Sequence, residues 1–220
     1  MRGRTRKRIR RSQEERREET RGAVLDATVE CLASRGYART TTAAIAHRAG
    51  VSRGALLHYY PSKQQLLAAA VEHVFARRTE EFRRAFATLP RDVDHRAAAV
   101  DLLWTMFSGP TFQAWLELVV AARSDRKLLE QVAGITTRFG ETVDATYHEL
   151  FPVPEDPGPF FGLAPRFVFA LLQGLALERV VIGDAPRVAE LLDVVKALAP
   201  LALPAEAAAA IPEPIERRSQ

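Results

Sequence analysis

The sequence predicts an all-α protein, and three observations support this fold class. Apolar residues recur at the spacing of an amphipathic helix along most of the chain. Serine residues followed three positions later by Glu or Gln mark helix starts, whereas glycine and proline mark helix ends. The sequence has no convincing alternation of period two and no internal repeat. With 47% hydrophobic and 26% charged residues among 220, the composition is typical of a soluble globular protein.

Composition and helix signals divide the chain into four segments. Residues 1–11 hold seven basic residues and no acidic one, so we expect a disordered basic arm. Residues 12–66 form an N-terminal head of three helices that contains a helix-turn-helix, and residues 67–203 form a C-terminal helical bundle. Residues 204–220 are rich in Ala and Pro, and we expect them to be a flexible tail.

The charge is distributed unevenly along the chain. Residues 1–66 contain 15 Lys and Arg against 6 Asp and Glu, whereas residues 67–220 contain 16 against 21. A basic front half indicates a module that binds a polyanion, joined to a second module with another role. The alternative is a solvated basic tail with no partner.

Several classes of protein are excluded by the residue types present. A single cysteine excludes a disulfide framework and a Cys-based zinc site. The basic start leads into SQEERREETR rather than an apolar run, and no apolar stretch approaches the ~20 residues of a membrane span. No HExxH pair, phosphate loop, Rossmann fingerprint or nucleophile elbow is present. We therefore expect a cytoplasmic protein that is not an enzyme, has no cofactor and does not enter a membrane.

The first helix is expected to begin at a capping box made by Ser12 and Glu15. One of its faces is apolar or small, which predicts that this face is buried, and Gly36 provides a left-handed stop. That inner face consists of Val24, Ala27, Thr28, Cys31 and Leu32. A buried structural thiol is therefore expected at Cys31.

Residues 41–60, TTAAIAHRAGVSRGALLHYY, have the pattern of two short helices that cross at a tight turn. Thr41 or Thr42 can cap the first helix and Ser52 the second, while Gly50 falls where the chain needs a positive φ. The positions expected to face inward are Ile45, Ala46, Ala49, Val51, Leu56 and Tyr60. Together these positions specify a helix-turn-helix.

Helical patterns continue after this motif. Ser62 and Gln65 form a capping box for a long helix from Lys63 to about Leu89, which Pro90 ends. Further helices are expected at about 93–107, 111–122, 126–150, 163–182 and 186–199, with a proline-rich loop at 151–160.

In a helix-turn-helix, the outward residues near the start of the second helix enter the major groove of DNA. Here these residues are Arg53, Gly54, Ala55, Leu57 and His58. Arg53 is expected to donate two hydrogen bonds to one guanine, which is worth about 1–3 kcal/mol of discrimination between bases. Thr42, Tyr59 and Lys63 flank the helix and suit phosphate oxygens.

The segment RGYARTTTAAIAHRAGVSRGALLHYYPSKQQLL resembles the DNA-binding domain of the tetracycline-repressor (TetR) family. The resemblance is carried by the G-Y followed by T-T, the I-A-x-x-A-G-V-S-x-G-x-L core, the aromatic pair and S-K-x-x-L-L. It covers about Arg21 to Leu67, and Leu57 departs from the tyrosine that many members carry. The resemblance implies a DNA-reading head of three helices, a helical ligand-binding body and a homodimer on a palindromic operator.

Bulky aromatic residues gather between residues 100 and 150, where they are expected either to line a ligand cavity or to fill an ordinary helical core. Polar groups such as Gln113, Glu117, Arg123 or His148 are available to orient a ligand. The candidate ligand-binding residues are Trp104, Phe107, Phe112, Trp115, Phe139 and Tyr147.

The last two helices are candidates for the dimer interface. FVFALLQGLAL (167–177) is apolar nearly all round, so one side is expected to pack on its own subunit and the other on a partner. In the final helix, an apolar stripe consists of Val188, Leu191, Leu192, Val195 and Leu198. Two copies are expected to pair these helices in a four-helix bundle.

These features favour a transcriptional regulator, specifically a repressor that an unidentified small-molecule effector of apolar character releases from double-stranded DNA. The alternative is an architectural DNA-binding protein with little sequence specificity and no ligand. The sequence leaves open the operator, the effector, the regulated genes and whether transcription is repressed or activated.

Overall fold

The computed structural model of the chain describes residues 13–90, 92–151, 153, 155 and 160–202, with side chains up to Ala199. Within these ranges the chain forms helices joined by short connections and no strand, which confirms the all-α prediction. The predicted arm (1–11), the predicted tail (204–220) and the capping residue Ser12 lie outside the described residues.

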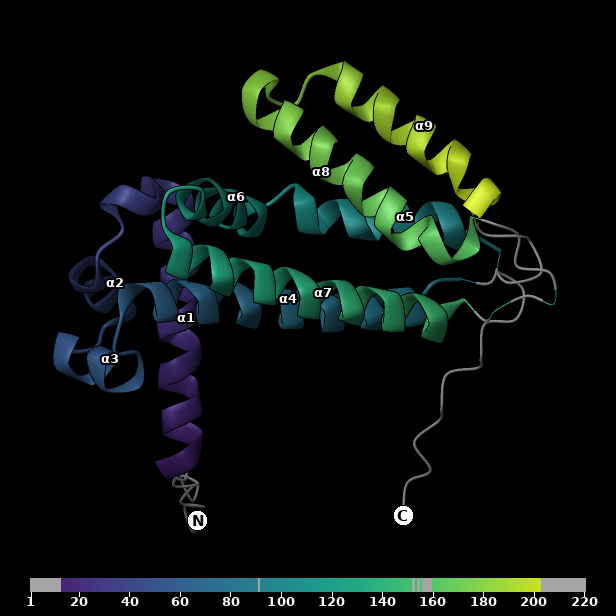
Figure 1. Cartoon of the computed structure of the whole chain (residues 1–220). Helices are drawn as coiled ribbons and strands as arrows, with labels where there is room; N and C mark the ends of the chain where they lie inside the picture. The colour runs from purple at the N-terminus through teal and green to yellow at the C-terminus, as the bar shows by residue number, and fades with distance from the viewer. Residues whose placement is uncertain (1–12, 91, 152, 154, 156–159, 203–220) are drawn as a thin grey trace, which may run out of the picture.

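Three helices form the head, one long helix leads out of it, and the remaining helices form the body (Figure 1). The head consists of α1 (Gln13–Arg39), α2 (Thr42–Ala49) and α3 (Arg53–Tyr59), and the long helix is α4 (Lys63–Ala87). The body consists of α5 (His95–Phe107), α6 (Pro110–Ala122), α7 (Arg126–Leu150), a 3₁₀ turn (Phe161–Leu163), α8 (Ala164–Ile182) and α9 (Pro186–Ala202). The predicted boundary at residues 66–67 falls inside α4, so this helix is shared by both parts.

The arrangement places α2 and α3 at one end of the molecule (Figure 1). From there α4 and α7 run side by side along its length, while α8 and α9 form an outer layer against α5. The N-terminal half of α1 projects beyond the other helices. None of the described helices is long and apolar enough to cross a membrane.

Side-chain caps mark the start of several helices. The Ser62 hydroxyl accepts a hydrogen bond from the Gln65 amide at 3.2 Å, as the capping box predicts. In the body, Asp94 and Asp125 cap α5 and α7 through the amides of Arg96 and Leu128. At Gly36 the backbone has φ 74° and ψ 168°, which interrupts α1 before a last turn to Arg39.

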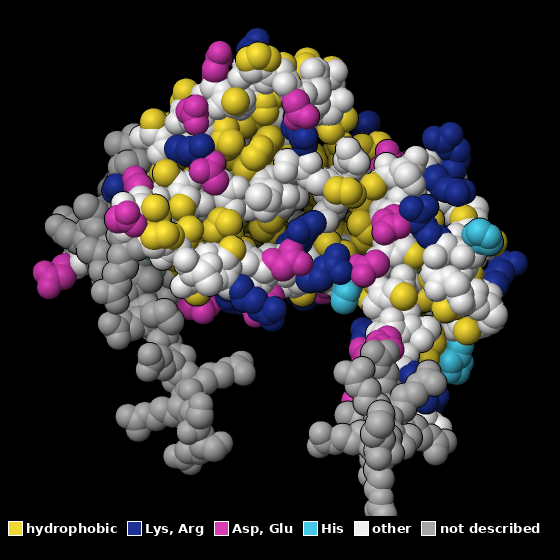
Figure 2. Space-filling model, turned by 180° about the vertical axis from the view of Figure 1, so that it is seen from behind, with side chains coloured by type: hydrophobic (Ala, Val, Ile, Leu, Met, Phe, Trp, Pro, Cys, Tyr) yellow, Lys and Arg dark blue, Asp and Glu magenta, His cyan; other side chains and the backbone are white. Residues whose placement is uncertain are grey.

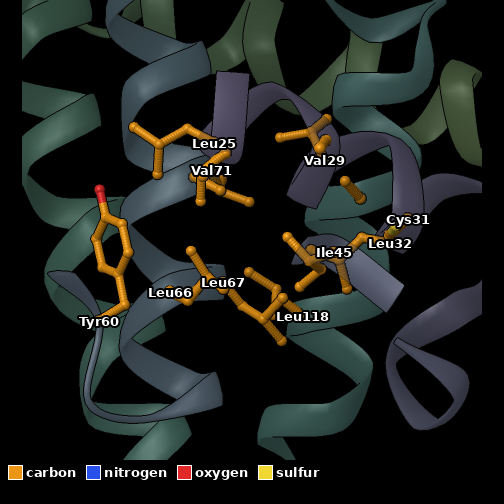
Figure 3. Close-up of a cluster of buried hydrophobic side chains, with 14 of the residues drawn as sticks. Leu25, Val29, Cys31, Leu32, Ile45, Tyr60, Leu66, Leu67, Val71 and Leu118 are labelled. Atoms are coloured by element: carbon orange, nitrogen blue, oxygen red, sulfur yellow. The ribbon is translucent and has the colours of Figure 1, made fainter. Parts of the chain in front are cut away.

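The predicted inner face of α1 is buried, as are Ile45, Leu56 and Tyr60 of the helix-turn-helix. These side chains form one apolar cluster with Leu66, Leu67 and Val71 of α4 (Figure 3). Leu118 of α6 enters the same cluster and is fully buried. The core of the head is therefore continuous with the body rather than closed on itself.

Candidate nucleic-acid interface and ligand cavities

The corner between α2 and α3 is fixed by backbone geometry and caps. Gly50 adopts the left-handed conformation with φ 67° and ψ 27°, and the Val51 amide donates to the Ala46 carbonyl at 3.0 Å. The Thr41 hydroxyl caps α2 by accepting from the Ala44 amide at 3.1 Å. Of the two threonines considered for this cap, Thr41 is therefore the one used. The Ser52 hydroxyl caps α3 in the same way, by accepting from the Ala55 amide at 3.1 Å.

This corner presents one face of α3 to solvent while the other face anchors the helix. Leu56 is 0% exposed, whereas Leu57 and Tyr59 are 36% and 40% exposed. All the residues predicted for the major groove are exposed together, namely Arg53, Gly54, Ala55, Leu57 and His58. The His58 and Tyr59 rings meet edge to face at 5.7 Å, which orders the end of this surface.

The predicted flanking residues have different surroundings. Tyr59 is exposed and Thr42 is half-buried at the first position of α2. The Lys63 ammonium is half-buried, donates to the Tyr37 carbonyl at 2.7 Å and lies 4.2 Å from the centre of the Tyr37 ring. Burial lowers the pKa of Lys63 below its usual value. In this structure the Lys63 cation therefore serves the head itself, and its contact with phosphate stays a prediction.

Two hydrogen bonds between residues distant in sequence fix the head, one inside it and one to the body, and no sequence pattern indicates either. The Arg21 guanidinium donates to the Tyr60 hydroxyl at 3.4 Å. The Tyr37 amide donates to the Glu117 carboxylate of α6 at 2.7 Å, across 80 positions of sequence. Glu117 was considered for ligand orientation, but its carboxylate faces the head.

Basic and apolar side chains are concentrated on different parts of the surface, although charged side chains also stand among the apolar ones (Figure 2). In this view from behind, Lys, Arg and His side chains gather on the end of the molecule that holds the head. Hydrophobic side chains are prominent on the upper part, which α8 and α9 form in Figure 1. The cations suit a polyanion at the head, and the apolar part is a separate surface.

The body contains a largely apolar cavity between α4, α5, α7, α8 and α9, with an empty volume of about 720 Å³ that includes open solvent. Phe139 and Tyr147, two of the six residues predicted to bind a ligand, line this cavity. Its two threonine hydroxyls already donate to backbone carbonyls, Thr79 to Phe75 and Thr146 to Thr142. Burial raises the pKa of Tyr147 well above its usual value.

A second cavity lies beside α6, with an empty volume of about 460 Å³ that includes open solvent. Phe107, Phe112, Trp115 and Phe139 all contribute to its lining. Phe139 thus borders both cavities. Trp104 packs on the apolar cluster of α5, α8 and α9 and borders neither cavity. Phe107 and Phe112 also line a third cavity, together with Gln113. The six predicted aromatic residues are therefore divided between several cavities and the core, and their role in binding a ligand stays a prediction.

The final helices combine a buried and an exposed apolar face. Val188, Leu192 and Val195 of α9 are buried within the chain, so most of the predicted α9 stripe is core. On α8, by contrast, a stripe of alternating four- and three-residue spacing is exposed and carries Val181, which is 79% exposed. This α8 stripe begins at Leu163 of the preceding 3₁₀ turn and continues with Phe167, Ala170, Gly174, Leu177 and Val181.

Comparisons with known proteins agree with this architecture. The family model described as "Bacterial regulatory proteins, tetR family" matches residues 24–70, which run from the middle of α1 through α2 and α3 to the start of α4. An uncharacterised HTH-type transcriptional regulator of Mycobacterium tuberculosis is 31% identical over 172 residues, which are 78% of this chain and 88% of that protein.

Solved structures of low sequence identity share the fold. The regulator FadR of Bacillus subtilis, solved in complex with stearoyl-CoA, superposes with a TM-score of 0.61 at 18% identity and covers 80% of this chain and 96% of its own. A transcriptional regulator of Saccharomonospora viridis, solved with choline, has a TM-score of 0.59 at 17% identity and covers 82% and 95%. The relatives are transcriptional regulators rather than enzymes. This chain therefore belongs to the tetR family of bacterial regulatory proteins and is a DNA-binding transcriptional regulator.

Proposed function

We propose that this protein is a homodimeric repressor that binds a palindromic operator and is released from it by a small apolar ligand. The observation that carries the proposal is the outer face of α3, where Arg53 and His58 are exposed on a helix anchored by buried Leu56. Arg53 reads guanine in the major groove, and Leu57 offers an apolar contact to a thymine methyl. Tyr59 and Thr42 contact phosphate and fix the register.

The exposed α8 stripe supports a homodimer. Its alternating four- and three-residue spacing suits helix pairing, and the small residues Ala170 and Gly174 lie at its centre between Phe167 and Leu177. Apart from the neighbouring residues and the backbone of its own helix, a Cβ at Gly174 would meet no atom of the chain within 4 Å, so the space there is open to a partner. A second copy is the fitting occupant, because two identical stripes cover each other about a twofold axis. Val194 and Leu198 of α9 extend the apolar surface.

The chemistry of the larger cavity favours an uncharged apolar ligand. Its lining is almost entirely apolar, and the described lining includes no carboxylate to balance a cationic ligand. The one basic group in that lining, Arg96, already pairs with Asp94 at 2.9 Å. A thermal-shift comparison of uncharged and cationic apolar compounds is expected to give stabilisation by the uncharged set only. Stabilisation by the cationic set would contradict this assignment.

The proposed mechanism is geometric. Operator half-sites lie one helical turn apart, about 34–36 Å, so both recognition helices must keep that spacing. A ligand in the body that tilts α4 changes the separation of the heads. In one conformation of the dimer the spacing of the heads fits the operator, and in another it does not. Release requires that the ligand bind the second conformation more tightly than the first.

The direct test is selection of bound sequences from a random duplex library at near-physiological salt, with the wild type and with Arg53→Ala. We expect a twofold-symmetric motif, and relaxed base preference at one position of each half-site in the variant. If the wild type selects no motif and its binding vanishes as salt rises, the architectural alternative is correct.

A further inference from the structure

The head and the body meet at a hydrogen bond between Glu117 of α6 and the backbone of the head. The Glu117 carboxylate accepts from the Tyr37 amide at 2.7 Å and is half-buried. The fit is close, because a Cβ at Gly36 would lie 3.0 Å from the Glu117 Oε2 atom. Gly36 also has a positive φ of 74°, so glycine meets both the conformational and the spatial demand there.

On the head side, Tyr37 is held from two directions. Its amide donates to Glu117, and its carbonyl accepts from the Lys63 ammonium at 2.7 Å. Lys63 is the first residue of α4 and follows the recognition helix α3 by a short turn. The contact between Glu117 and Tyr37 therefore sets the position of Lys63 at the start of α4, and with it the position of α3.

On the body side, α6 connects this contact to a cavity. Trp115 lies two residues before Glu117, lines the cavity beside α6 and meets the Phe75 ring of α4 at 5.4 Å. Leu118, the next residue after Glu117, is fully buried among the head side chains (Figure 3). One short helix thus touches the cavity, the head core and the Tyr37 backbone, so a shift of α6 moves all three contacts together.

We infer that Glu117 is a positioning residue for DNA recognition: through the Tyr37 peptide and Lys63 it holds α3 at the angle that reads operator sequence. The inference rests on the proposed function. A carboxylate that accepts from an amide forms a charge-assisted hydrogen bond, about twice as strong as a neutral one. Loss of this bond loosens the Tyr37 segment and lets the orientation of α3 vary, which weakens base contacts more than phosphate contacts because base contacts depend on register and orientation.

The test compares full-length Glu117→Ala and Glu117→Gln with the wild type on two duplexes of equal length. One duplex carries the motif that the wild type selects, and the other is a scrambled sequence. We expect Glu117→Ala to weaken binding of the selected duplex about tenfold and binding of the scrambled duplex less than about twofold. Glu117→Gln is expected to fall between Glu117→Ala and the wild type, because an amide oxygen still accepts the hydrogen bond.

Glu72→Gln is the matched control. Glu72 accepts from Arg138 at 2.7 Å and joins α4 to α7 rather than α6 to the Tyr37 backbone, so its variant is expected to bind both duplexes like the wild type. Melting temperature is recorded for every variant. If Glu117→Ala does not fold, the affinities of Glu117→Gln for the two duplexes are compared with those of the wild type instead. Amide exchange in the peptide that contains Tyr37 is expected to slow when the selected duplex binds the wild type, and less so in Glu117→Gln.

Three outcomes would overturn the inference. A folded Glu117→Ala with wild-type affinity for the selected duplex would show that the contact does not position α3. An equal loss of affinity for both duplexes would show a general structural role instead. If the wild type itself does not distinguish the duplexes, the proposed function is wrong and this inference is overturned with it.

Discussion

Leu56→Ala and Leu57→Ala test the two faces of α3 one at a time, the buried face that anchors the helix and the exposed face that is proposed to read DNA. Leu56 is 0% exposed in the head core, whereas its neighbour Leu57 is 36% exposed. A buried Leu→Ala change loses transfer free energy and leaves a cavity, which costs about 2–5 kcal/mol of unfolding free energy. In a chain of this size, each kcal/mol of unfolding free energy lost lowers the melting temperature by about 2–4 °C. A loss of about 3 kcal/mol is therefore expected to lower it by about 6–12 °C. A change at Leu57 is expected to alter stability by less than about 0.5 kcal/mol.

The assay records thermal unfolding by circular dichroism and operator affinity on the same samples. Leu56→Ala is expected to reduce both the melting temperature and the affinity, because α3 loses its anchor. Leu57→Ala is expected to reduce affinity for the selected operator at an unchanged melting temperature. The reasoning would be refuted if Leu57→Ala were the more destabilised variant, or if Leu56→Ala kept the wild-type melting temperature.

Three further predictions concern the corner, the thiol and the exposed stripe. Gly50→Ala places a side chain at φ 67° and is expected to lower the unfolding free energy by about 1–2 kcal/mol in urea titrations; equal stability would contradict this. Burial raises the pKa of Cys31 above its usual 9.0, so the unfolding free energy is expected to fall as pH rises from 9.0 through the raised pKa. Iodoacetamide is expected to react with this thiol only after unfolding. Rapid alkylation of the native thiol would disprove its burial. Gly174→Leu is expected to keep the helical spectrum but to shift sedimentation from dimer to monomer, because the new side chain enters the space that the partner helix is proposed to occupy. A dimeric variant would count against the α8 interface.

Local signals in the sequence predicted most of the head. The caps at Thr41, Ser52 and Ser62 and the left-handed turn at Gly50 depend on neighbouring residues only, so a pattern of a few positions was enough. Gly36 was predicted as a left-handed stop and does have positive φ, but its ψ of 168° lies outside that region and the chain resumes one helical turn. The last turn of α1 therefore follows from packing beyond the helix.

These local patterns do not predict contacts between residues that are far apart in the sequence. The bond between Tyr37 and Glu117 joins two elements whose spacing in sequence carries no periodic signal. For the same reason the sequence did not indicate that Lys63, which is expected to contact phosphate, also donates to the Tyr37 carbonyl and lies over the Tyr37 ring. The aromatic content of residues 100–150 predicted a cavity or a core, and the rotation of each helix decides which of these roles a residue has. Trp104 and Phe139 show this, because one packs in the core and the other borders two of the cavities.

The proposed function requires that two α3 helices, held by one dimer, read two half-sites at a fixed spacing. The most direct measurement is the affinity of the wild type for its selected operator before and after insertion of five base pairs between the half-sites. Half a helical turn moves one half-site to the other side of the duplex, so both heads can no longer bind together. The account predicts that affinity falls at least about tenfold, to the level of a duplex with a single half-site. Equal affinity for both duplexes would contradict it.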